Sequence, residues 1–161
     1  MKNKDLFTLK EGLKEAKKLQ GVKFAYAVAK NSRLVDHEIE LLQETIIPSE
    51  DFTEFEDKRN ELVKKYAKKD KNGEPKQETQ DVNGQTFSFF KIDDIPAYNE
   101  EAKPLEEEYK EVIESRNTQL KEYDTQLEED CGLVLHKVVI DIVPENITGE
   151  TLELIDWMIE E

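Results

Sequence analysis

The sequence predicts an α+β fold that is mostly helical, with long helices in an antiparallel bundle or helical hairpin beside a small three-stranded antiparallel sheet. Several long segments repeat apolar residues at every third or fourth position, as amphipathic helices do. Asn83-Gly84 stands between two strand-like stretches, and the run LVLHKVVIDIV (133–143) is rich in β-branched residues. With 161 residues the chain can bury a core, so we expect residues 1–161 to form a single domain.

The first helical part is expected over about residues 9–69. Residues 9–19 form a short amphipathic helix, which Gly12 weakens and Gly21 ends. A long amphipathic helix follows over about residues 22–45. Its inward face is expected to consist of Phe24, Val28, Asn31, Val35, Ile39 and Leu42.

Pro48 and Ser49 separate the second helix from a third one. Ser49 is a natural N-cap, because its side-chain oxygen can accept a hydrogen bond from an N–H group of the first helical turn. The residues expected to face inward are Phe52, Phe55, Leu62, Val63 and Tyr66. The lysine-rich run 64–71 suits the negative end of the helix dipole, and its alternative interpretation is a patch that faces an anion or a nucleic acid.

A β-hairpin is predicted over residues 78–91. Its strands are expected near 78–82 and 85–91, joined by a type I′ turn at Asn83-Gly84, a dipeptide that tolerates positive φ. Side chains alternate between the two faces of a strand, so Phe87 and Phe89 share one face. The third strand of the sheet is expected at 133–142.

A long acidic helix is predicted over about residues 104–129. It carries a narrow apolar stripe, which suits a coiled-coil seam better than a broad globular core. We therefore expect the chain to form a homo-oligomer through a seam made of Tyr109, Val112, Leu120 and Tyr123. After Pro144, Thr148 is expected to cap a last helix over 149–160, so that the strand and this helix occupy 133–160.

The charge of the chain is divided unevenly. Residues 1–71 carry 16 Lys/Arg against 14 Asp/Glu, whereas residues 72–161 carry 7 against 24. An acidic half repels nucleic acid and attracts basic surfaces, so we expect a protein partner with a basic surface and no direct nucleic-acid binding. The candidate partner-binding residues lie on the acidic helix and are Glu106, Glu107, Glu111 and Glu114.

The sequence offers little catalytic chemistry. Cys131 and His136 are five residues apart with nothing to orient one against the other, and no phosphate-binding glycine motif is present. Glutamates of the acidic helix share a face and could hold a hard cation, but they fit a solvated surface better. We therefore expect no enzyme activity, no catalytic or metal site and no cofactor.

The sequence also indicates where in the cell the protein acts. No apolar run reaches the roughly 18 residues that a membrane-spanning helix needs, and the N-terminal segment lacks the apolar core of a signal peptide. A single cysteine excludes an internal disulfide and is compatible with a reducing compartment. We expect a cytoplasmic protein with no membrane partner.

Three segments carry a resemblance to a known group of proteins. They are FAYAVAKNSRLVDHEIELLQE (24–44), FEDKRNELVKKYAKKDKNGEP (55–75) and VPENITGETLELIDWMIEE (143–161). In this order they resemble small proteins encoded by tailed phages and prophages of Gram-positive bacteria. The resemblance implies a protein that acts in the bacterial host cytoplasm or becomes part of a virion. It carries no catalytic motif, so no residue roles are transferred.

Three functions are therefore open. The leading hypothesis is a non-enzymatic protein–protein interaction protein, which in a sharper form inhibits a host defence protein by presenting an acidic helical surface in place of DNA. The first alternative is a structural component of the virion or of its assembly. The second is an enzyme that uses a carboxylate-bound metal.

Overall fold

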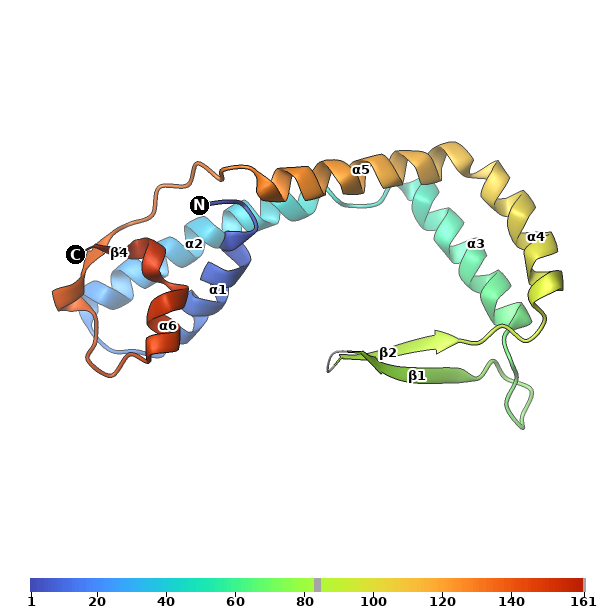
Figure 1. Cartoon of the computed structure of the whole chain (residues 1–161), viewed down its shortest axis with the longest axis horizontal. Helices are drawn as coiled ribbons and strands as arrows, with labels where there is room; N and C mark the ends of the chain where they lie inside the picture. Colours follow the sequence, from blue (N-terminus) through green and yellow to red (C-terminus); the bar gives the residue numbers. More distant parts are fainter. Residues whose placement is uncertain (83–84, 161) are drawn as a thin grey trace. The chain divides into compact units, whose positions relative to one another are not determined.

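The computed structural model describes residues 1–82 and 85–160, and its chain divides into two compact units. The first unit combines residues 1–47 with residues 119–161, and the second consists of residues 48–118. Both contain helices, and strands are short, so the α+β, mostly helical class is confirmed (Figure 1). The prediction of a single domain over residues 1–161 stays a prediction.

The first unit is built on α1 (Asp5–Ala16) and α2 (Val22–Glu44). The predicted inward face of α2 is confirmed, because its members are all at most 5% exposed. The chain returns to cover these helices with α6 (Gly149–Leu154) and the segment before it. The shared core consists of Leu6, Leu9, Leu13, Ala16, Phe24, Ala27, Val28, Val35, Ile39, Leu42, Leu135, Val138, Ile155 and Met158.

Gly12 has a packing role that the sequence did not indicate. It lies in the middle of α1 and is buried where α6 packs against that helix. A Cβ atom at this position would lie 2.5 Å from Cβ of Leu154 and 2.9 Å from Cγ2 of Ile155. The glycine therefore allows the two helices to approach closely.

The second unit contains α3 (Glu50–Tyr66), α4 (Ile95–Glu108) and the start of α5 (Lys110–Glu128). The predicted N-cap of α3 is confirmed, because the N–H of Phe52 donates to Oγ of Ser49 at 3.2 Å. α3 packs along α4, and of its five predicted inward residues Phe55 is buried and the others are half-buried. An 18-residue membrane-spanning segment is not found in any helix of the described residues.

The predicted hairpin is confirmed in its strands. β1 (Gln77–Val82) pairs antiparallel with β2 (Gln85–Phe90) in one continuous register, in which Thr79 lies opposite Ser88. At the open end of the hairpin, Lys68 lies between the two strands, since its N–H donates to the carbonyl of Lys91 and its carbonyl accepts from Lys76, each at 2.8 Å. The predicted type I′ turn at Asn83-Gly84 falls outside the described residues.

The predicted three-stranded sheet is wrong, because the described strands form two separate pairs. Instead of a strand over 133–142, the structure has β3 (Val138–Val139), which pairs in parallel with β4 (Ile159–Glu160), and a 3₁₀ turn over Ile140–Ile142. The residues before β3 have no regular secondary structure, and His136 among them bonds to α2. The buried side chain of Asn31 on α2 hydrogen-bonds to both the N–H and the carbonyl of His136.

The predicted ends of three helices also differ from the structure. The first helix, expected over residues 9–19, is α1, which begins at Asp5 and ends at Ala16. Pro104 lies inside α4 instead of starting a helix, and the chain turns at Tyr109 before α5 begins. In a helix interior, proline removes one backbone hydrogen bond and crowds the carbonyl four residues earlier, so Pro104 weakens α4 locally without ending it. The last helix, expected over 149–160, ends at Leu154, although its predicted cap is confirmed by a 3.1 Å bond from the N–H of Thr151 to Oγ1 of Thr148.

Candidate functional site: a groove in the second unit

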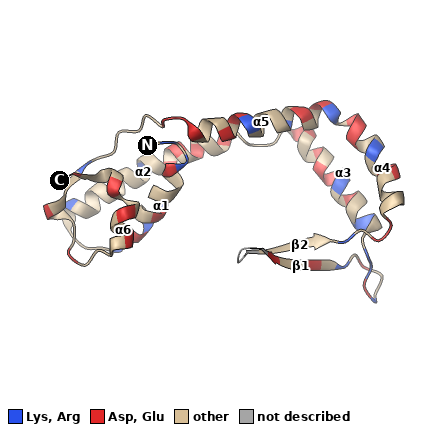
Figure 2. Cartoon of the chain, in the orientation of Figure 1, with Lys and Arg blue, Asp and Glu red and all other residues tan. Residues whose placement is uncertain are grey.

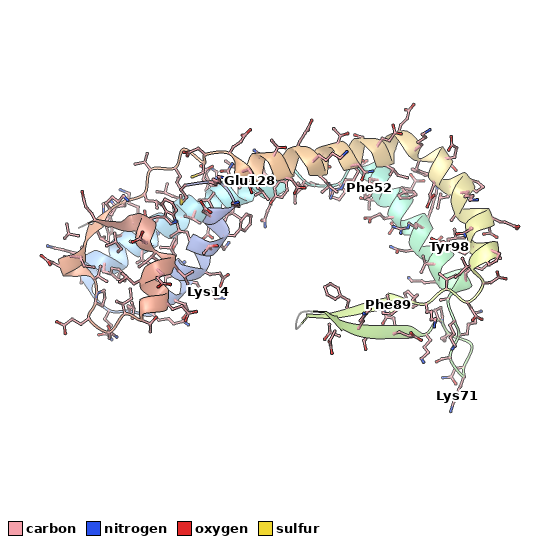
Figure 3. All side chains as sticks on the ribbon, viewed as in Figure 1. Lys14, Phe52, Lys71, Phe89, Tyr98 and Glu128 are labelled. Atoms are coloured by element: carbon pink, nitrogen blue, oxygen red, sulfur yellow. The ribbon has the colours of Figure 1, made fainter. Side chains whose placement is uncertain are left out.

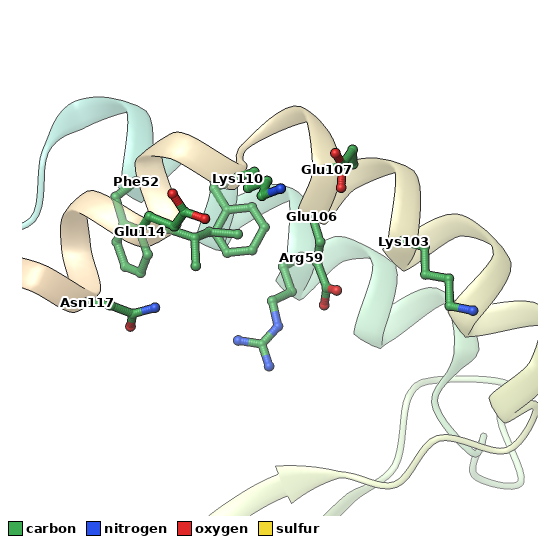
Figure 4. A pocket seen from close by; sticks show the side chains of 10 residues that line it. Phe52, Arg59, Lys103, Glu106, Glu107, Lys110, Glu114 and Asn117 are labelled. Carbon is green, nitrogen blue, oxygen red and sulfur yellow. The ribbon is translucent and has the colours of Figure 1, made fainter.

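A groove of about 700 Å³ lies between α3 and the α4–α5 segment of the second unit (Figure 4). One wall is α3, and the other combines the end of α4 with the first three turns of α5. The lining residues are Phe52, Phe55, Arg59, Lys103, Glu106, Glu107, Lys110, Ile113, Glu114 and Asn117. Its volume falls within the range typical of ligand and side-chain pockets, roughly 300–1,000 Å³.

The floor of the groove is apolar. Phe52 and Ile113 are half-buried and Phe55 is buried, and the two phenyl rings lie 5.9 Å apart between centroids. The guanidinium of Arg116 lies 5.5 Å from the centroid of Phe52, a distance at which a cation is attracted to the ring face. The floor therefore offers an apolar surface at the centre of the groove.

Tyr109 fixes the wall at the turn between α4 and α5. Its ring packs 5.6 Å from that of Phe55, and its hydroxyl accepts from Nζ of Lys58 at 2.6 Å and donates to Oε1 of Glu54 at 3.0 Å. Lys58 also pairs directly with Glu54 at 2.8 Å. The hydrogen bond from Lys58, followed by that from Tyr109, lowers the pKa of the Glu54 carboxyl. The bonds that Lys58 makes to Glu54 and then to Tyr109 raise the pKa of Lys58.

A second polar cluster ties the other ends of α3 and α4 together. Nζ of Lys65 donates to both carboxylate oxygens of Glu101, at 2.6 and 2.7 Å, and the Tyr66 hydroxyl donates to Oε1 at 2.7 Å. These bonds favour the charged carboxylate, so the hydrogen bond from Lys65 and then that from Tyr66 lower the pKa of Glu101. Tyr98 of α4 adds an edge-on contact with the Tyr66 ring at 6.2 Å (Figure 3). The two walls are thus joined at both ends of α4.

The rim of the groove carries charges of both signs. Glu106, Glu107 and Glu114 are exposed, and no ion pair to any of them is found among the residues that the structure describes. Lysines interrupt this acidic row at positions 103 and 110. Over residues 95–114 the chain nevertheless carries seven Asp/Glu against two Lys, and acidic residues dominate α4 and the start of α5 (Figure 2).

The structure brings three of the four candidate partner-binding residues to one place. Glu106, Glu107 and Glu114 line the groove, whereas Glu111 is exposed on α5 and does not line it. Sequence reasoning missed the contribution of α3, and Arg59 above all. The available signal was the pair Phe52 and Phe55, whose inward direction predicts a surface that a second helix must cover.

The four residues of the predicted oligomer seam lie in two different units. Tyr109 and Val112 belong to the second unit, where the first is buried and the second half-buried. Leu120 is 39% exposed in the first unit, where Tyr123 packs against the core. Tyr109 and Tyr123 thus have contacts within the chain, and the seam stays a prediction.

Cys131 and His136 each have contacts within the first unit. Cys131 is half-buried, and its Sγ accepts from the N–H of Leu133 at 3.5 Å. The ring of His136 lies edge-on to Tyr26 at 5.9 Å. Within residues 1–82 and 85–160 there is no group of three or more His, Cys, Asp or Glu side chains placed to hold a metal ion.

Comparison of the chain with protein families, with curated proteins and with solved structures found no match.

Proposed function

We propose that this chain is a non-enzymatic protein-interaction protein, which binds a basic amphipathic helix of a partner protein in the groove of its second unit. The observation that carries this proposal is the joint presence of an apolar floor and exposed carboxylates without ion pairs among the described residues. An amphipathic helix binds such a groove by placing its apolar side chains on the floor and its charged ones at the rim. The excess of acidic residues over 95–114 selects a basic partner.

The fixed walls support the same proposal. The Tyr109 cluster and the Lys65–Glu101 pair hold α3 and α4 together without a partner. A groove that exists before binding requires less ordering of side chains when the partner arrives, which favours affinity. The site therefore combines a preformed shape with complementary charge.

The resemblance to proteins of tailed phages and prophages supports a bacterial setting for this interaction. The partner is then a host or phage protein, in the host cytoplasm or in the virion. The position of the gene among early regulatory or late structural genes separates these settings, and copurification with intact particles tests the structural alternative.

A sharper form of the proposal is inhibition of a host defence protein that normally binds DNA. The carboxylates of Glu106, Glu107, Glu111 and Glu114 support it, because all four are exposed and could stand in for phosphates. The lysines at 103 and 110 lie along the same segment and reduce the likeness to a phosphate row. Competition by duplex DNA for the captured partner separates this form from simple helix binding.

Charge reversal in the groove tests the proposal. The triple variant Glu106→Lys, Glu107→Lys, Glu114→Lys should lose at least tenfold in affinity for a partner captured from bacterial lysate. The matched control is Glu122→Lys, Asp124→Lys, Glu129→Lys, which changes the net charge equally at exposed positions outside the groove. Retained binding in the control and lost binding in the groove variant supports the site.

Equal loss in both variants would show that only net charge matters, and unchanged binding in both would place the partner elsewhere. A photo-crosslinking amino acid at Asn117, which lines the groove, should crosslink to the same partner. The same amino acid placed in the triple groove variant should not. Calorimetry with Mg²⁺, Mn²⁺ and Ca²⁺ tests the remaining alternative, a metal-dependent enzyme.

A further inference from the structure

β2 has an edge that is unprotected against pairing. Its six residues, QTFSFF, include no charge and no proline, in a chain of which 38% of the residues are charged. The register with β1 is continuous, so no bulge twists the edge away. Among the described strands, only β1 pairs with β2.

The hairpin also exposes two aromatic side chains. Phe87 is 52% and Phe89 is 41% exposed, and their spacing of two residues places them on one face of β2. A hairpin of two strands is marginally stable in water, and it gains stability when further strands extend the sheet. The exposed phenylalanines and the two-stranded sheet would therefore both gain stability from a partner strand beside β2.

We infer that β2 pairs antiparallel with β2 of a second copy of this chain, forming a four-stranded sheet across a two-fold axis. When the pairing is centred on Ser88, Phe87 of each copy lies opposite Phe89 of the other. Aromatic residues that face each other across strands stabilise such a pair. The segment is thus complementary to itself, as an isologous contact requires.

The distribution of charge favours pairing of two copies through β2 and disfavours pairing through β1. Two copies of a chain with a formal charge of −15 repel each other, and an uncharged strand is a place where they can approach. β1 carries Glu78 and Asp81, so pairing through its outer edge would bring carboxylates of two copies together. The assembly consequently stops at two copies instead of growing into a fibre.

This contact is independent of the groove. None of the groove-lining residues belongs to β2, and the partner here is the chain itself rather than another protein. Failure of one proposal leaves the other untouched.

Engineered thiols test the register directly. In a Cys131→Ser background, Ser88→Cys places two thiols opposite each other at the axis, where cross-strand Cβ atoms lie about 4.5–5.5 Å apart, close to disulfide reach. Thr79→Cys is the matched control, since Thr79 is exposed on the same face opposite Ser88 but lies on β1. Its two copies would be three strand spacings apart, about 14 Å.

Mild oxidation should cross-link Ser88→Cys into a dimer at least tenfold faster than Thr79→Cys. Equal rates would mean random collision and would overturn the inference.

Sedimentation equilibrium provides the second test. The wild-type chain should dimerise in a concentration-dependent way, and Phe87→Glu should shift it to a monomer, whereas Thr79→Glu should leave the dimer intact. A strict monomer at all concentrations, a dimer unaffected by Phe87→Glu, or growth beyond two copies would each contradict the inference.

Discussion

The side-chain amide of Asn31 holds both backbone polar groups of His136. Nδ2 donates to the His136 carbonyl at 2.9 Å, and the His136 N–H donates to Oδ1 at 2.7 Å. Asn31 is fully buried on α2, while His136 lies in the irregular segment before β3. A single side chain therefore satisfies both backbone groups of a residue that belongs to no described helix or strand.

Replacement of Asn31 by leucine should destabilise the first unit. The apolar side chain cannot bond to His136, whose N–H and carbonyl would be left without their partners, and we expect a loss of about 2–4 kcal/mol in the free energy of unfolding. Urea unfolding measures this loss. The control is Lys30→Leu, at an exposed neighbouring position, where a change within about 0.5 kcal/mol is expected. Similar losses in both variants would contradict the role of the Asn31 amide.

Gly12→Ala should also destabilise the chain, although alanine favours helices by about 1 kcal/mol. The added Cβ would lie 2.5 Å from Cβ of Leu154, so α1 and α6 must separate. We expect a net loss of about 1–3 kcal/mol, typical of overpacking. In Gly149→Ala the new Cβ meets no heavy atom within 4 Å, and this control should unfold like the wild type. Greater stability of Gly12→Ala would disprove the close approach.

Tyr109→Phe should raise the pKa of the Glu54 carboxyl towards its ordinary value. The tyrosine hydroxyl donates to this carboxylate at 3.0 Å and thereby favours its charged form. A carboxyl-detected NMR titration measures the shift. Tyr98→Phe is the control, since among the described residues no hydrogen bond to the Tyr98 hydroxyl is found, and it should leave the Glu54 titration unchanged. An unaltered Glu54 titration in Tyr109→Phe would show that the Tyr109 hydroxyl does not stabilise the charged form of Glu54.

The N-terminal segment should make stability depend on pH through Glu128. Nζ of Lys2 and Nζ of Lys4 each lie 2.7 Å from its carboxylate. The hydrogen bond from Lys2, followed by that from Lys4, lowers the pKa of Glu128 from 4.5 to about 2. Because the folded pKa is the lower one, the contribution is present above pH 4.5 and is lost as the pH falls towards 2. In Glu128→Gln the free energy of unfolding should therefore fall less steeply than in the wild type as the pH decreases through this range.

The control for this pH effect is Glu122→Gln, an exposed glutamate of α5 without an ion pair among the described residues. It should keep the pH dependence of the wild type. An identical pH dependence in Glu128→Gln and the wild type would contradict the contribution of Glu128.

Local signals in the sequence predicted much of the fold. The spacing of Phe24, Val28 and Val35 located the buried face of α2, and Ser49 and Thr148 located two helix caps, because these signals act over a few neighbouring residues. The third strand failed for the opposite reason. β-branched residues indicate an extended backbone, but the partner of that backbone, Asn31, lies 105 residues away in the chain.

The candidate site was predicted in part for a similar reason. The acidic residues of the helix pointed to its surface, and three of the four named glutamates line the groove. The helix was expected to be continuous over 104–129, whereas the structure turns at Tyr109, whose hydroxyl bonds to Lys58 and Glu54 of α3. Periodicity within one helix carries no information about such contacts with another helix.

The second unit is formed by one continuous stretch of chain, while the first unit is assembled from two stretches on either side of it. A ribosome releases the chain from its N-terminus at about 5–20 residues per second, so the groove-bearing unit has all its residues before α1 and α2 meet Leu135 or Met158. The part of the α1 and α2 core that the C-terminal stretch covers consequently stays exposed for on the order of 5–20 seconds during synthesis. In that interval a chaperone that binds apolar segments has its best opportunity to engage the nascent protein.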